Sequence, residues 1–349
     1  MKKALSLLAF MSSVQSEFRS RERYGTAHVY CSVIRSVSAY AGSGFPLCDL
    51  SASFLKGYED HLIFEKKLSW NTSSTYMRCL QSVYNRALRS GHVPFVPHLF
   101  KEVFTGVKRN HRRALCVDDL RRLVCDHPSS SLSVSAPASP SRAVSPSSSS
   151  GISVPCRVNT RMGVSTARAY LELMLRFQGM CFVDLAFLRK SDLKDGYLCF
   201  RRHKTRMPLC IRMTDESRRL LLPYLNHDPS SPYLLRILNG RLRGYASYRD
   251  YQKQLRLFNT SLKQLARERQ VFACVSTYCA RHSWATQAKY CGIPPSVISE
   301  GLGHASVTTT EAYLKSFESG VLDQANAQVM DYIFHGKQAS PSSFGTNCF

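Results

Sequence analysis

Residues 128–155 limit how this chain can fold more than any other part of its sequence. Ser, Pro, Ala and Val dominate the segment, and Arg142 is its one charged residue. Such a composition buries too little apolar surface to offset the entropy lost on ordering, so it predicts a flexible loop. Because helix-like residues 114–126 directly precede it, we interpret the loop as an insertion inside the second of two domains. We place the linker between the domains in the basic stretch 107–113.

Length and charge indicate the class of partner. The 349 residues are enough for two domains with sizeable cores. Lys and Arg number 47 against 24 Asp and Glu, which gives a net charge of +23. Basic residues lie in both halves, and such an excess suits a polyanion, most often nucleic acid.

Hydrophobic periodicity predicts a mainly α protein with a small antiparallel β-sheet, an α+β fold. Residues 26–41 carry an apolar stripe at helical spacing, Ser51 caps a second helix, and a third runs from about residue 71 to before Gly91. Further helices are expected over residues 114–126 and 165–178. Two short strands, 197–202 and 208–213, should flank a turn at Lys204.

The N-terminus and the cysteines bear on location. Residues 1–17 imitate a secretory signal but lack an A-x-A cleavage site, and we expect a poorly defined N-terminal arm. No apolar run reaches the length of a membrane span. The 13 cysteines show no C-x-x-C pair and no metal-ligand spacing. We expect small buried thiols in a cytoplasmic protein, with no bound metal, at Cys181, Cys199, Cys210, Cys274 and Cys279.

The stretch 278–317 carries the chemistry. It places Arg281, His304 and Tyr313 in order, with Leu-Gly-His nine residues before the tyrosine and a Thr-rich turn between. Arginine can bind two phosphate oxygens, and histidine can exchange a proton near neutral pH. A phenol can become a covalent nucleophile. Together these groups can attack a phosphodiester without a metal.

This pattern resembles the C-terminal half of the tyrosine recombinases, the phage-integrase family of site-specific DNA recombinases. The resemblance implies a helical core-binding domain over residues 18–110, a catalytic domain over 114–336 and a flexible tail over 337–349. It implies that Tyr313 attacks DNA to form a 3′-phosphotyrosyl bond, that Lys204 protonates the departing 5′ oxygen, and that neither metal nor ATP nor another cofactor is needed.

Two positions depart from the family pattern. Tyr278 stands where the family carries a histidine, and Cys181 stands where it carries its first arginine. Gln178 is near enough to bind a phosphate but brings no charge. Arg176, or an arginine from elsewhere such as Arg202, is a candidate substitute. Asp184 matches an acidic position that the resemblance implies orients an arginine.

The resemblance also implies partners. We expect double-stranded DNA with specific recombination sites, and a homo-oligomer, a tetramer on two DNA sites, formed by docking of a final helix over residues 321–333. Packing of that helix within its own chain is the alternative. Basic residues expected on the DNA are Arg78, Arg86, Arg89, Lys108, Arg109 and Arg202.

Other functions stay open at the level of sequence. Cys181 and Tyr278 would also suit a catalytically impaired, recombinase-like DNA-binding regulator, and the basic charge would suit an RNA-binding protein. Integration, excision and inversion share one chemistry, so the sequence does not separate them. We expect a bacterial protein that acts on DNA in the cytoplasm.

Overall fold

A computed structural model describes residues 5–108, 114–125, 162–304, 306–311 and 314, together with 326, 327, 329 and 330. The chain divides into two compact units. One comprises residues 1–110 and 243–248, and the other comprises residues 111–242 and 249–349. The predicted insertion 128–155, the tail 337–349 and most of the final helix lie outside the described residues.

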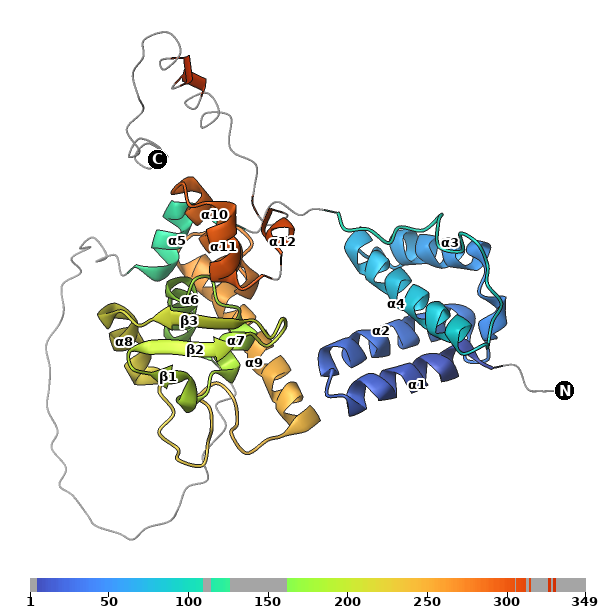
Figure 1. Ribbon diagram of the computed structural model, residues 1–349, viewed down its shortest axis with the longest axis horizontal. Coiled ribbons are helices and arrows are strands. Elements are labelled where there is room, and N and C mark those ends of the chain that lie inside the picture. The colour runs from blue at the N-terminus through green and yellow to red at the C-terminus, as the bar shows by residue number, and fades with distance from the viewer. Residues whose placement is uncertain are drawn as a thin grey trace, which may run out of the picture. The chain divides into compact units, whose positions relative to one another are not determined.

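The first unit is helical. It contains α1 (Leu7–Ser20), α2 (Tyr24–Ala41), α3 (Ala52–Asp60) with a π-helical continuation (His61–Glu65), and α4 (Trp70–Arg89), and α1 packs along α2 (Figure 1). The Ser51 and Ser69 hydroxyls accept from the backbone N–H groups at the starts of α3 and α4, which satisfies donors that a helix start leaves unpaired. Tyr58, Met77 and Leu80 lie fully buried in the core of this unit.

Helix α1 corrects the expectation of a poorly defined arm over residues 1–17. Leu7, Met11 and Val14 recur at helical spacing and are buried in the core of the first unit, together with Phe18. The apolar run that imitates a signal core is therefore one face of an amphipathic helix.

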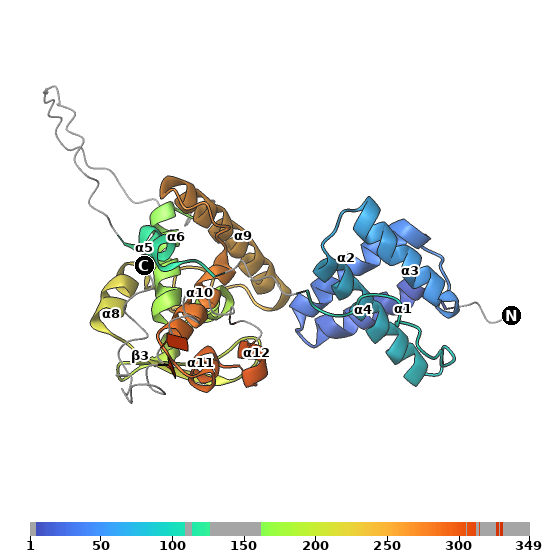
Figure 2. The ribbon, with the colours of Figure 1, turned by 90° about the horizontal axis from the view of Figure 1, so that it is seen from above.

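The second unit combines helices with one small sheet. Its helices are α5 (Val117–Val124), α6 (Val164–Arg176), α7 (Phe182–Phe187), α8 (Asp215–Leu221), α10 (Thr277–Tyr290), α11 (Pro295–Leu302) and α12 (Val307–Glu311). Helix α9 (Gly244–Glu268) belongs to this unit from residue 249 onward. Helices α5, α8 and α10 pack against α6, which runs through the middle of the unit (Figures 1 and 2).

The sheet has the order β1-β2-β3 and is antiparallel, with β1 (Leu193–Lys194), β2 (Tyr197–Arg201) and β3 (Pro208–Arg212). Leu198 and Ile211 face each other across β2 and β3 and point into the core. The fold is therefore mainly helical with a small antiparallel sheet, as the sequence predicts. Short β1 is an element that the periodicity does not reveal.

The expectation of buried thiols is wrong for three of its five cysteines, and a fourth, Cys181, is only half-buried. Cys199 and Cys210 are paired across β2 and β3, form a disulfide, and lie on the exposed face of the sheet. Strand alternation explains this position, because the neighbours Leu198 and Phe200 point inward. Cys274 is exposed as well, whereas Cys279 is buried.

Within the described part of the chain, no helix combines the length and the apolar character needed to cross a bilayer. No group of three or more His, Cys, Asp and Glu side chains there could hold a metal ion.

Candidate active site

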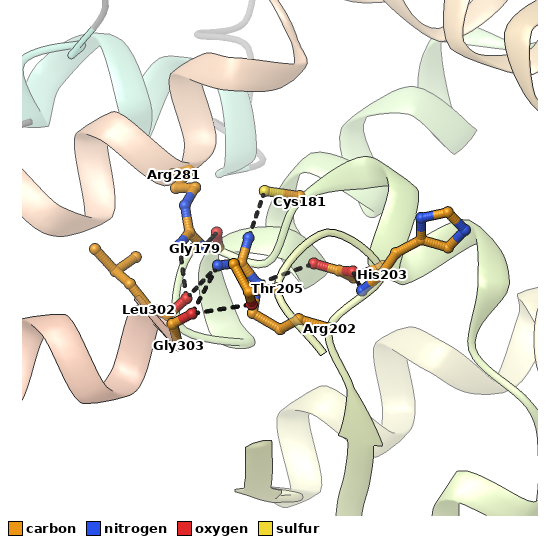
Figure 3. Close-up of polar contacts among 9 residues, drawn as sticks. Gly179, Cys181, Arg202, His203, Thr205, Arg281, Leu302 and Gly303 are labelled. Carbon is orange, nitrogen blue, oxygen red and sulfur yellow. Dashed lines mark hydrogen bonds and ion pairs between the residues drawn. The ribbon is translucent and has the colours of Figure 1, made fainter. Parts of the chain in front are cut away.

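Arg281 occupies the middle of α10 and is 3% exposed. Its Nη1 donates to the carbonyl oxygen of Gly179 at 3.2 Å, and its Nη2 donates to that of Leu302 at 2.6 Å (Figure 3). Leu302 ends α11, and Gly179 lies in the turn before α7. These bonds connect three segments that are far apart in the sequence and fix the guanidinium where they meet.

A second buried arginine lies beside the first. Arg202 directly follows β2, is 4% exposed, and donates through Nη1 to the carbonyls of Leu302 at 2.9 Å and Gly303 at 3.0 Å. Figure 3 shows both guanidinium groups at the end of α11, that of Arg281 coming from α10 and that of Arg202 from the end of β2. Because both donate to the Leu302 carbonyl, the two cations are close neighbours in a site with little water.

Asp184 on α7 orients Arg202. Its Oδ2 lies 3.4 Å from Arg202 Nε, and its Oδ1 accepts from the backbone N–H of His203 at 2.7 Å. One buried carboxylate therefore holds both the side chain of residue 202 and the backbone that follows it. The resemblance implies that Asp184 orients an arginine, and the arginine that it contacts is Arg202.

Two glycines make room for the arginines. Gly303 has φ +60° in the left-handed region, and a Cβ there would lie 2.6 Å from Arg202 Cδ. Gly179 has φ +66°, and a Cβ there would lie 3.1 Å from Arg281 Cα. A side chain at either position would be strained in its backbone and would crowd an arginine of the site.

His304 follows this cluster directly. Its Nδ1 lies 2.8 Å from the hydroxyl oxygen of Thr310, a fully buried residue of α12. Burial lowers the pKa of His304 to about 4, and the positive charges of Arg281, Arg202 and Lys204 contribute in the same direction. The imidazole is therefore neutral at neutral pH.

The charge balance of the site favours an anion. Among the described residues of the second unit, the buried charged side chains are Arg202, Arg281 and Asp184. Two cations and one anion leave an excess of one positive charge where water screens poorly, so an anionic ligand gains more here than on an open surface.

The other predicted catalytic residues surround this centre. Lys204 is exposed in the turn between β2 and β3, and its charge reaches His304. Gln178 and Cys181 are half-buried. Tyr278 is 42% exposed, one turn before Arg281 on α10. The structure thus brings a lysine, two arginines and a histidine into one region.

Tyr313 lies outside the described residues, but its flanks are placed. The Thr310 hydroxyl contacts His304 on one side. On the other side, Leu314 packs against a cluster formed by Ala285, Ala288, Ile298 and Leu302. The backbone N–H of Leu314 donates to the carbonyl of Thr310 at 3.0 Å.

The residues expected on DNA differ in their surroundings. Arg78 and Arg89 are exposed, whereas Arg86 is half-buried and forms an ion pair with Glu17 at 2.6 Å. Lys108 is exposed, with its Nζ 4.0 Å from the centroid of the Trp70 ring. Arg109 lies outside the described residues. Arg202, which was grouped with these residues, is instead buried beside Arg281.

Sequence reasoning missed Thr310 and the spatial role of Gly303. In the sequence, Thr310 belongs to the Thr-rich turn of the motif, and that position predicts no separate role for its hydroxyl. No local signal assigns the Thr310 hydroxyl to the ring of His304, because that contact requires α11 and α12 to be packed together.

Solved structures of DNA integrases share this fold. A lambda integrase dimer bound to a COC′ core site is 17% identical with a TM-score of 0.57, and the match covers 90% of this chain and 100% of that chain. A lambda integrase tetramer bound to a Holliday junction gives 17% and 0.57, covering 90% and 78%. The Tn1549 transposon integrase in complex with a circular intermediate DNA gives 14% and 0.58, covering 93% and 99%. At these identities the likeness defines the fold.

Family profiles give the more specific assignment. The phage integrase SAM-like domain matches residues 6–103, and the phage integrase family matches residues 159–319. No curated protein sequence matches the chain. The chain belongs to the tyrosine recombinases of the phage integrase family.

Proposed function

We propose that this protein is a site-specific DNA recombinase that cuts and rejoins strands through a 3′-phosphotyrosyl intermediate at Tyr313. The observation that carries the proposal is the pair of buried guanidinium groups at the Leu302 carbonyl, next to a neutral His304. The excess positive charge is suited to one phosphodiester. Positions 310 and 314, on either side of Tyr313 in the chain, both contact this region.

The proposed reaction exchanges one phosphodiester for another. The phenol oxygen of Tyr313 bonds to phosphorus as the bond to the 5′ oxygen breaks, and the departing oxygen takes a proton from Lys204. Arg281 binds a nonbridging oxygen, where negative charge grows in the transition state. Because one ester replaces another, the free energy of the bond is kept and no ATP is required.

The pKa of His304 should rise when DNA binds. Its low pKa arises from burial and from cations beside it. A bound phosphate would counter those cations and raise the pKa of the ring, since an anion nearby favours the charged form. The imidazole would then accept the phenol proton more readily in the DNA complex than in the free protein.

Partners follow from the same assignment. The related integrases were solved on DNA as dimers and as a tetramer, which supports duplex DNA and a homo-oligomer as partners here. The residues proposed to dock between protomers, 321–333, lie mostly outside the described part of the chain. We place the action on DNA in the cytoplasm.

Covalent capture tests the proposal. The purified protein and its Tyr313→Phe variant would each be incubated with sheared genomic DNA of the source organism, and protein-linked DNA would be recovered after denaturation and sequenced. The proposal expects linkage for the wild type alone, at 3′ ends that cluster at defined sites. Specific DNA binding without linkage would favour the regulator, and linkage that persists in the phenylalanine variant would exclude Tyr313.

An RNA-binding role finds less support. RNA binding does not require buried arginines beside a histidine, and the family assignment points to DNA. Competition of labelled duplex DNA with an equal mass of RNA would separate the two, because a recombinase should keep its specific duplex under that challenge.

A further inference from the structure

The hydrogen bonds of Arg202 are uneven in strength. Nε contacts the Asp184 carboxylate, and Nη1 donates to two carbonyl oxygens. Nη2 contacts only the Cys181 sulfur within the described structure, at 3.5 Å. Sulfur is a weak acceptor, so a phosphate oxygen could replace it at little cost. Nη2 is therefore the edge of this guanidinium best suited to a ligand.

The position of that edge matters as much as its weak contact. Arg202 and Arg281 donate to the same carbonyl oxygen, so the two cations stand side by side where Cys181 ends. The cysteine side chain is shorter than that of an arginine and brings no charge to this pair. An arginine at position 181 would bring a third cation against the first two, with Asp184 as the one buried carboxylate among the described residues of the second unit to balance them.

The surrounding backbone also fits Arg202. Gly303 leaves space for its methylene chain, because a Cβ there would lie 2.6 Å from Cδ. Asp184 holds both the guanidinium and the N–H of the next residue. The surroundings thus accommodate an arginine that follows β2 and not one that precedes α7. They consist of small residues at positions 181 and 303 and an acid at position 184.

We infer that Arg202 is a catalytic residue that binds a nonbridging oxygen of the scissile phosphate beside Arg281, in place of the arginine absent from position 181. This inference rests on the proposed function. The competing role is purely structural, with Arg202 joining the β2–β3 turn to α11. The two roles predict a different dependence of the Arg202→Ala rate deficit on the charge of the substrate.

The test compares Arg202→Ala with Arg201→Ala. Arg201 is the preceding residue, is exposed, and carries the same charge, so it controls for the loss of one positive charge at the end of β2. Each variant would be given a nicked duplex bearing the site found by covalent capture, with either a normal phosphate or a neutral methylphosphonate at the scissile position. Covalent adduct would be measured against time, and DNA binding by titration.

On the normal phosphate we expect Arg202→Ala to form adduct about 10²–10³-fold more slowly than Arg201→Ala, a loss typical for one group that stabilises transition-state charge. On the methylphosphonate the gap should close to within about tenfold, because the charge that Arg202 would neutralise is absent. Binding should remain similar for the two variants.

Three other results would have distinct meanings. Equal rates for the two variants on the normal phosphate would overturn the inference and leave the proposed function standing. An equal deficit of Arg202→Ala on both substrates would assign Arg202 a structural role and also overturn it. Absence of any wild-type adduct would overturn the proposed function, and the inference with it.

A second variant covers a failure to fold. Removing Arg202 alone leaves the Asp184 carboxylate buried without its partner, which is strongly destabilising. The double variant Asp184→Asn/Arg202→Gln removes both charges together and keeps amides that can bond each other. Its rate on the methylphosphonate should approach that of Arg201→Ala, and a persistent deficit there would count against the inference.

Discussion

The glycine before the site histidine offers a sharp test of how the arginines are held. In Gly303→Ala the new Cβ would lie 2.6 Å from Arg202 Cδ, whereas carbon atoms pack favourably at about 3.5–4.0 Å. Cδ must therefore move by about 1 Å. The side chain cannot swing away freely, because its guanidinium bonds to Asp184, Leu302 and Gly303.

A matched control separates the crowding from the backbone strain. Gly292, after α10, has φ +76°, and a Cβ built there meets no heavy atom within 4 Å. Gly292→Ala and Gly303→Ala should each lose about 1–2 kcal/mol of stability for the left-handed backbone. Crowding should add about 1–3 kcal/mol for Gly303→Ala alone.

Activity should diverge further than stability. A shift of about 1 Å in a positioning group can reduce a rate about 10²-fold, so we expect that loss of adduct formation in Gly303→Ala and a wild-type rate in Gly292→Ala. Urea unfolding and the nicked-duplex assay measure the two quantities. Equal stability and equal rates for the two variants would refute the reasoning that a glycine at position 303 is needed to leave space for the Arg202 side chain.

Three further predictions concern charge and protons. The pKa of His304 is lowered from 6.5 to about 4 in the folded protein, so between these pH values the unfolded chain binds a proton that the folded chain does not, and stability should fall as pH falls from about 6.5 to 4. Urea unfolding at several pH values should show that the free energy of unfolding depends less on pH in His304→Gln than in the wild type. An unchanged pH dependence would contradict the shift. Lys204→Ala should slow cleavage of a normal duplex but not of one with a 5′-bridging sulfur, because a thiolate leaves without an acid; a deficit on both substrates would remove Lys204 from that role. DNA affinity should fall steeply between low and moderate salt as counterions are released, and a flat titration would argue against a phosphate-binding surface.

Local signals were sufficient for most of the fold. Ser51 caps α3 as its sequence position predicts, and the turn at Lys204 joins two strands as their alternation predicts. Together with the register of β2 and β3, the same alternation places Cys199 opposite Cys210 on the outer face of the sheet. The error at the N-terminus arose because a short apolar run is read equally well as a signal core or as one face of α1.

The site was predictable where chemistry follows chain order and unpredictable where it depends on packing. Arg281 and His304 belong to one recognisable motif. Arg202 was only one of several candidate arginines, because its bonds to Leu302 and Gly303 span 100 and 101 positions in the sequence. No local pattern reports a contact of that range, and the same limit hid the contact between Thr310 and His304.

The identity of the residue that becomes bonded to DNA tests the central claim most directly. A trapped adduct would be digested with protease and nuclease, and the peptide that carries the residual nucleotide would be sequenced by mass spectrometry. The account predicts a nucleotide linked through a 3′ phosphate to Tyr313. A nucleotide on Tyr278 or on any other side chain, or a linkage through the 5′ phosphate, would contradict it.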